Sequence, residues 1–204
     1  MSMKQEKATA AMGRPREFDT DDALNRAMHV FWRKGYLGTS LSDLTEAMGI
    51  NRPSLYAAFG NKESLFRKVL DRYADGPSAY LREALKEPTA RQVVERMIYG
   101  VVDLGTDPRN PPGCLWVHGT LSCGDPTDPI RQELSARRAS SEAALRNRFE
   151  RAISEGDLPA DSDPDALARF VITVNCGISV LAATGAPKVE LLRVVKTALQ
   201  AWPE

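Results

Sequence analysis

The sequence predicts an all-α protein of about nine helices. Apolar residues recur at helical spacing along nearly all of the 204 residues, and no alternating pattern of any length predicts a strand. Glycine and proline separate the helical segments. With 43% hydrophobic and 26% charged residues, the composition is that of an ordinary globular protein, long enough for one large or two small domains.

The N-terminal segments are short and sharply delimited. Residues 1–17 are polar and small, which predicts a flexible arm; it carries the cations Lys4, Lys7, Arg14 and Arg16. Asp19 is placed to cap a first helix, which we expect to end at Gly35. A fourth helix is expected after Gly60-Asn61, with a break at Gly76-Pro77.

Residues 40–59 predict two helices joined by a tight turn. Ser40 and Asp43 form a capping box that starts the first of them, and Gly49 supplies the left-handed turn that ends it. Only two residues then precede Arg52 and Pro53, which open the second helix. Such a pair forms a helix-turn-helix, whose second helix can project into the major groove of DNA. A helical hairpin inside a bundle is the alternative.

The rest of the chain predicts further helices around a loop rich in proline and glycine. We expect helices over residues 88–104, 129–155, 164–184 and 187–202. Residues 105–113 are expected to form the loop. Residues 170–187 carry no charge and approach the length of a membrane span. Their polar residues and glycines favour a buried bundle helix, and covering it on most sides points to a second subunit rather than a membrane.

Charge and cysteine content suggest an intracellular protein with a weak electrostatic asymmetry. The 27 Lys/Arg balance the 27 Asp/Glu overall, while residues 1–73 hold 12 basic against 9 acidic side chains. Three cysteines without a Cys-x-x-Cys motif do not form a disulfide framework. No signal peptide is visible, so we expect a cytoplasmic location.

The run GYLGTSLSDLTEAMGINRPSLYAAFGNKESLF, residues 35–66, resembles the DNA-binding domain of the TetR family of bacterial transcriptional regulators. The similarity covers about residues 14–66; Ala57-Ala58 departs from it, because many members have a bulkier residue before Phe59. The resemblance implies three N-terminal DNA-binding helices followed by a helical ligand-binding and dimerisation domain. We therefore divide the chain into an arm (1–17), a helix-turn-helix domain (18–61) and a ligand-binding and dimerisation domain (62–204).

The same resemblance assigns the DNA contacts. It implies phosphate contacts by Thr39, Tyr56 and Lys62, the last beside a helix N-terminus. Arg52 and Ser54 are the candidates for base contacts, since arginine can bind guanine through two hydrogen bonds. A solvated surface residue is the alternative for each.

Three interpretations compete for the stretch GCLWVHGTLSCG (113–124), which resembles a ligand-pocket segment of some TetR-type regulators. Cys114, His118 and Cys123 could simply pack, since a free cysteine often behaves as a small hydrophobe. Cys114 could instead be a thiol switch, if the helix N-terminus and His118 lower its pKa. A metal site is the third alternative, although no fourth ligand is evident.

A mainly hydrophobic small-molecule pocket is expected inside the C-terminal helices. Its candidate lining residues are Tyr99, Cys114, Trp116, His118, Phe149, Asn175 and Cys176. Core packing explains each of them equally well.

These observations favour a repressor that binds a pseudo-palindromic operator in double-stranded DNA as a homodimer and leaves it when an unknown small molecule binds. The dimer would form through the last two helices, and no cofactor or metal is expected. A regulator that senses oxidants or electrophiles through Cys114 is the alternative. An enzyme is disfavoured, because no P-loop, H-E-x-x-H, G-x-S-x-G or dinucleotide motif occurs. An interaction module without DNA binding is the third possibility.

Overall fold

The computed structural model describes residues 18–122 and 128–203, and within these ranges the chain forms ten α-helices and no strand. The helices are α1 (Thr20–Gly38), α2 (Leu41–Met48), α3 (Arg52–Phe59), α4 (Lys62–Asp75), α5 (Ala79–Ala84), α6 (Ala90–Thr106), α7 (Leu115–Ser122), α8 (Pro129–Ser154), α9 (Pro164–Ala183) and α10 (Lys188–Gln200). The all-α expectation is confirmed. The count exceeds the expected nine, because α5 and α7 are separate short helices.

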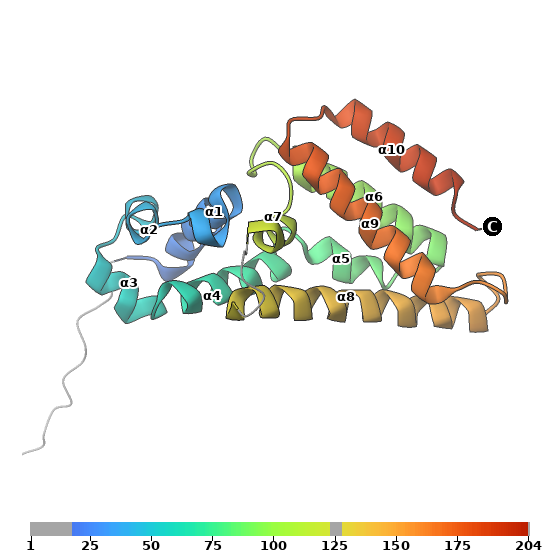
Figure 1. Cartoon of the computed structure of the whole chain (residues 1–204), viewed down its shortest axis with the longest axis horizontal. Helices are drawn as coiled ribbons and strands as arrows, with labels where there is room; N and C mark the ends of the chain where they lie inside the picture. The colour runs from blue at the N-terminus through green and yellow to red at the C-terminus, as the bar shows by residue number, and fades with distance from the viewer. Residues whose placement is uncertain (1–17, 123–127, 204) are drawn as a thin grey trace, which may run out of the picture.

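The molecule is elongated, with two groups of helices at its ends (Figure 1). Helices α1–α4 form one end, and α6, α9 and α10 form the other. The long helix α8 runs along one side, and α7 lies between the two groups.

Helix boundaries follow the predicted caps. The Asp19 side chain accepts hydrogen bonds from the first turn of α1, and Ser40 and Asp43 form the predicted capping box. Gly49 ends α2 with a φ of 68°, in the left-handed region that favours glycine. Asp163 caps α9 ahead of Pro164.

The first helix breaks at Gly35, where we expected its end, and then continues for one more turn. Gly35 has a φ of 68° and a ψ of 173°, which interrupts α1, and one further turn continues to Gly38. Glycine reaches this φ without the steric penalty that a side chain adds. After the break, the Tyr36 ring stacks on that of Phe31 at a centroid distance of 6.3 Å and lies tilted against that of Phe66 at 5.0 Å.

Helices α1–α4 share one apolar core, which also takes in part of the second half of the chain. Its largest fully buried members are Phe31, Trp32, Leu44, Leu55, Leu65, Phe66, Leu70, Tyr73, Leu115 and Ile130. Leu115 belongs to α7 and Ile130 to the first turn of α8. Because α4 buries its apolar side in this core, we call α1–α4 the reading head, although the sequence-based boundary lies at residue 61.

A second core lies among α6, α8, α9 and α10. Ile98, Val102, Phe149 and Val171 are fully buried within it. Arg148 is also buried, and its guanidinium donates to the carbonyls of Glu87 and Pro88, at the turn that precedes α6. These two hydrogen bonds partly compensate the guanidinium for its loss of solvent, which would otherwise make the charge costly to bury.

Helix α9 has the length and composition of a membrane span but packs as a bundle helix. Among the described residues, it is the one helix long and apolar enough to cross a membrane. It packs against α6, α8 and α10. Only 28% of its most apolar window is buried within the chain, so a large apolar surface remains uncovered.

Gly113 marks the closest approach of the loop before α7 to α9, which yields a stability prediction. Its φ is 84°, and a Cβ there would lie 2.9 Å from the Cβ of Ala183 and 3.0 Å from the carbonyl oxygen of Ser179. Gly113→Ala therefore combines left-handed strain, about 1 kcal/mol, with overpacking, roughly 1–3 kcal/mol. We expect a loss of about 2–4 kcal/mol in the free energy of unfolding, measured by urea denaturation.

Gly156→Ala is the matched control. Gly156 also has a positive φ, 77°, but nothing lies within 4 Å of its added Cβ. It should lose only the strain, about 1 kcal/mol. Equal losses in the two variants would show that the approach at Gly113 is looser than described.

Candidate nucleic-acid interface and effector region

The predicted helix-turn-helix is present and is fixed from within by its apolar side chains. Leu44 and Met48 of α2, together with Leu55 and Phe59 of α3, are buried in the core of the reading head. The turn between the helices consists of Gly49, Ile50 and Asn51, and the Asn51 side chain caps α3 by accepting from the amide of Ser54 at 2.9 Å. The opposite side of α3 therefore faces outward.

The outward side of α3 carries the predicted contact residues. Tyr56 is 49% exposed, an unusual exposure for a large ring, and Arg52 is also exposed. Ser54 is half-buried, in the first turn of α3. The structure brings these three side chains together on one short helix.

Arg52 is held by a hydroxyl rather than by a carboxylate. Its Nη2 donates to Oγ of Ser42, on α2, at 3.1 Å. Four other cations of the reading head form ion pairs with carboxylates: Arg26 pairs with Asp22, Lys34 with Asp43, Arg67 with Glu63, and Arg72 with Asp21. Among the described residues no carboxylate forms an ion pair with Arg52, so its positive charge remains available to an anionic partner.

Lys62 is placed by an aromatic ring. Its Nζ lies 4.5 Å from the centroid of the Tyr36 ring, which is within the range of a cation–π contact. Partial burial lowers the pKa of Lys62, and the negative charge of Asp43 acts against this decrease. The ammonium lies in the first turn of α4, where a helix N-terminus also favours an anion.

The expected phosphate contact by the Thr39 side chain is not supported by its position. Thr39 is only 1% exposed, and its hydroxyl donates to the carbonyl of Gly35 at 2.6 Å. Its single proton is thus used inside the protein, where the break in α1 leaves that carbonyl open to this bond. The Thr39 hydroxyl is therefore not part of the candidate interface.

Sequence reasoning missed an ion pair that joins α1 to α2 beside the candidate interface. Lys34 Nζ lies 2.6 Å from Oδ1 of Asp43, whose other oxygen accepts from the amide and hydroxyl of Ser40. The hydrogen bond from Lys34, followed by those from Ser40, lowers the pKa of Asp43 to about 2. The capping box predicted Asp43, but its partner lies in α1 and has no signal in the local sequence.

Around α7, three of the predicted pocket residues face the reading head. Tyr73 donates its hydroxyl proton to Sγ of Cys114 at 3.3 Å and accepts from the amide of Leu115 at 3.4 Å. Trp116 Nε1 donates to Oγ of Ser78 at 3.3 Å. His118 Nδ1 lies 3.1 Å from the carbonyl oxygen of Trp32, in α1.

The surroundings of Cys114 favour the packing interpretation over the thiol switch. Burial raises the pKa of the Cys114 thiol, and the hydrogen bond from Tyr73 only partly opposes this. The lowered pKa that a thiol switch would require is therefore not found, because loss of solvent outweighs the hydrogen bonds to the thiol. Among the described residues no cluster of three or more metal-ligating side chains occurs, and Cys123 lies outside them.

The other predicted pocket residues do not all converge on this region. Tyr99 is 44% exposed, because the buried stripe of α6 runs through Ile98, Val101 and Val102. Phe149 is fully buried in the second core, where its ring lies 5.2 Å from that of Trp202. Both are corrections to the expected lining.

Asn175 and Cys176, on α9, remain candidates beside Cys114. They are half-buried, and the charge of a Cys114 thiolate would raise the pKa of Cys176, which burial already raises. Oδ1 of Asn175 is buried and has no hydrogen-bond partner among the described residues. A buried acceptor of this kind can receive a hydrogen bond from a ligand.

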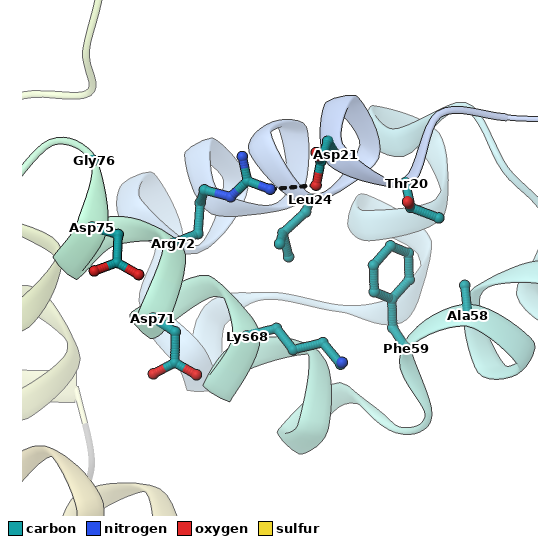
Figure 2. Close-up of a pocket in the computed structure, with 10 residues that line it drawn as sticks. All are labelled: Thr20, Asp21, Leu24, Ala58, Phe59, Lys68, Asp71, Arg72, Asp75 and Gly76. Atoms are coloured by element: carbon teal, nitrogen blue, oxygen red, sulfur yellow. Dashed lines mark hydrogen bonds and ion pairs between the residues drawn. The ribbon is translucent and has the colours of Figure 1, made fainter.

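Two hollows of the described surface lie away from these candidates. A groove of about 690 Å³ lies between α1 and α4 of the reading head, with Leu24 and Phe59 on its apolar side and Lys68, Asp71 and Arg72 around it (Figure 2). A second, of about 380 Å³, lies between the loop after α6 and the turn between α9 and α10. The expected interior pocket coincides with neither.

Comparison with known proteins matches both halves of the chain. Residues 23–69 match the model of bacterial regulatory proteins of the tetR family, and residues 88–191 match the tetracyclin repressor-like C-terminal domain. The HTH-type transcriptional repressor ComR of Escherichia coli K12 is 36% identical over 94% of this chain and 92% of its own length. The uncharacterized HTH-type regulator YezE of Bacillus subtilis 168 is 33% identical over 84% and 89%.

Solved structures agree with this assignment. A cysteine-substituted form of the TetR family regulator CifR, complexed with 26-base-pair double-strand operator DNA, is 47% identical; the match covers 93% of this chain and all of that one, with a TM-score of 0.88. A TetR regulator from Rhodococcus sp. RHA1 is 45% identical over 91% of this chain and all of its own, with a TM-score of 0.61. The chain belongs to the TetR family of bacterial transcriptional regulators.

Proposed function

We propose that this protein is a homodimeric repressor that binds a pseudo-palindromic operator and leaves it when a small molecule binds. The observation that carries the proposal is the outward surface of α3 and the start of α4. There Arg52 and Lys62 have no carboxylate ion-pair partner among the described residues, and the ring of Tyr56 is exposed. CifR complexed with operator DNA and the repressor ComR support the same function. Family membership identifies a regulator rather than an enzyme.

The proposed operator follows from the geometry of a dimer. Two recognition helices related by a two-fold axis contact half-sites about 34–36 Å apart, or a multiple of this distance. Such an operator reads as an inverted repeat. We expect the protein to act in the cytoplasm, where it meets bacterial DNA.

We propose that α9 and α10 form the dimer interface. Val180 and Leu181 of α9 are 39% and 44% exposed, and Val189 and Val194 of α10 are 60% and 40% exposed. Exposed apolar side chains gathered on adjoining helices are typical of a covered interface. A two-fold axis beside them would join four helices.

We propose that the effector acts on α7 from the side of α9. The candidates for contact are Cys114, Trp116, His118, Asn175 and Cys176. A ligand that favours a different position of α7 would move its contacts with Trp32 and Tyr73, and with them the reading head. The ligand shifts this equilibrium only by its difference in affinity between the two states.

Control by a thiol switch is the less favoured version. Cys114 is 8% exposed with a raised pKa, whereas a reactive thiol needs access and thiolate character.

Operator binding can be tested by selection from random double-stranded DNA followed by gel shift. The protein should enrich one inverted repeat and bind it as a dimer. Enrichment of no sequence above the starting pool would overturn the proposal.

Lys62→Ala tests the phosphate contact. Loss of one contact should weaken binding to all sequences and reduce the slope of log affinity against log salt by about 0.9. Fluorescence anisotropy over a range of salt concentrations measures both. Lys68→Ala is the control, since Lys68 also lies on α4 but lines the groove beside α1; its slope should stay that of the wild type. Equal slopes in all three proteins would contradict the role of Lys62.

Leu181→Glu tests the dimer interface. The side chain is 44% exposed in the single chain, so the protomer should still fold, while the dimer would bury an unpaired charge at a cost of several kcal/mol. Sedimentation should report monomers at concentrations where the wild type is dimeric. Leu37→Glu, at a residue 54% exposed in the reading head, should remain dimeric. Dimers in both variants would place the interface elsewhere.

Alkylation tests the state of Cys114. Because burial raises its pKa, the thiol should stay protonated and shielded at pH 7.5, and iodoacetamide should modify it far more slowly in the folded than in the urea-unfolded protein. Peptide mass spectrometry assigns the modified cysteine. Rapid labelling of Cys114 in the folded protein would restore the thiol switch.

A further inference from the structure

The contact between Arg52 and Ser42 differs from the other arginine contacts of the reading head. Arg26, Arg67 and Arg72 are each joined to a carboxylate, whereas Arg52 donates to the neutral hydroxyl of Ser42. A carboxylate beside Arg52 would neutralise the guanidinium and repel phosphate. A hydroxyl fixes its direction and leaves the charge intact.

The guanidinium keeps enough donors for a base after it contacts Ser42. Arginine has five N–H donors, and the recorded bond uses one on Nη2. Binding guanine requires two of the remaining donors, directed to O6 and N7. The contact to Ser42 is therefore compatible with base recognition.

The backbone of α2 sets the position of Ser42. It lies in the first turn of α2, next to Asp43, which is fixed by Ser40 and by the ion pair with Lys34. Ser42 is exposed on the same surface as Arg52. The long arginine side chain, otherwise free to adopt many rotamers, thus gains a fixed point from a different helix. Ordering such a side chain before binding lowers the entropy cost of the complex.

We propose that Ser42 is a positioning residue for base recognition, which holds the Arg52 guanidinium toward one base pair of each half-site. This inference rests on the proposed DNA-binding function and adds a specificity residue on α2. Ser42 acts through Arg52, so its removal should affect the base pair that Arg52 reads and leave the others unchanged.

The experiment uses the full chain and the inverted repeat selected from random DNA, with every base pair of one half-site changed in turn. Arg52→Ala should relax preference at one base pair by roughly 5- to 100-fold. Ser42→Ala should relax the same base pair by about 2- to 10-fold, the value of one hydrogen bond. The double variant should resemble Arg52→Ala alone, since the two residues act as a unit.

Two further variants separate positioning from a structural role. Ser42→Thr keeps the hydroxyl and should restore the preference to within about twofold of the wild type. Glu46→Gln alters an exposed residue one turn further along α2; it should raise affinity for all sequences alike and change no base preference. Thermal unfolding should be similar in all the variants.

The outcomes distinguish the inference from the proposed function. If the wild type selects no sequence, the DNA-binding function fails and this inference fails with it. If Arg52→Ala relaxes one base pair while Ser42→Ala relaxes none, or weakens all sequences equally, the positioning role alone is overturned. Relaxation of one shared base pair, with rescue by threonine, supports it.

Discussion

Tyr73 joins the two halves of the molecule, because its buried hydroxyl donates to Cys114 and accepts from the amide of Leu115 at the start of α7. Its ring also packs edge-on against Trp32, in α1, at a centroid distance of 4.8 Å. The core of the reading head therefore extends into α7 and the first turns of α8. Since packed cores adopt discrete arrangements rather than deform continuously, a displacement of α7 has to be shared by α1 and α4.

The cations of the reading head have two roles: some join helices through ion pairs, and others lie at the candidate DNA interface. Ion pairs such as Lys34–Asp43 and Arg72–Asp21 hold helices together and neutralise their own cations. Arg52 and Lys62 are instead held by a hydroxyl and an aromatic ring, which orient a cation without cancelling its charge. A protein of zero net charge can bind a polyanion in this way, because the local arrangement of charge decides the potential at the surface.

At the opposite end of the molecule, apolar rather than charged side chains remain exposed in the single chain. Helices α9 and α10 bury one side in the second core and leave Leu181 and Val189 exposed on others. A second copy would cover this surface and would also fix the separation of the two reading heads. In the proposed dimer, dimerisation and half-site spacing would depend on the same pair of helices, and α7 lies between these helices and the reading head (Figure 1).

The helices and the helix-turn-helix could be predicted from the sequence alone, because they depend on local chemistry. Caps at Asp19 and Ser40 and the left-handed Gly49 act within a few residues, and each has the predicted role. The exposure of Arg52 and Tyr56 also followed from helical spacing.

The partners of each helix face could not be predicted from the sequence, because they depend on packing between distant segments. The tertiary structure buried the Thr39 hydroxyl against Gly35, exposed Tyr99, placed Phe149 in the other core, and joined Arg52 to Ser42. Helical periodicity shows which residues share a face, but contacts between segments distant in sequence decide which face is covered and by what. The state of Cys114 depends on the same contacts, because its pKa is set by burial against Tyr73, 41 residues away in the chain.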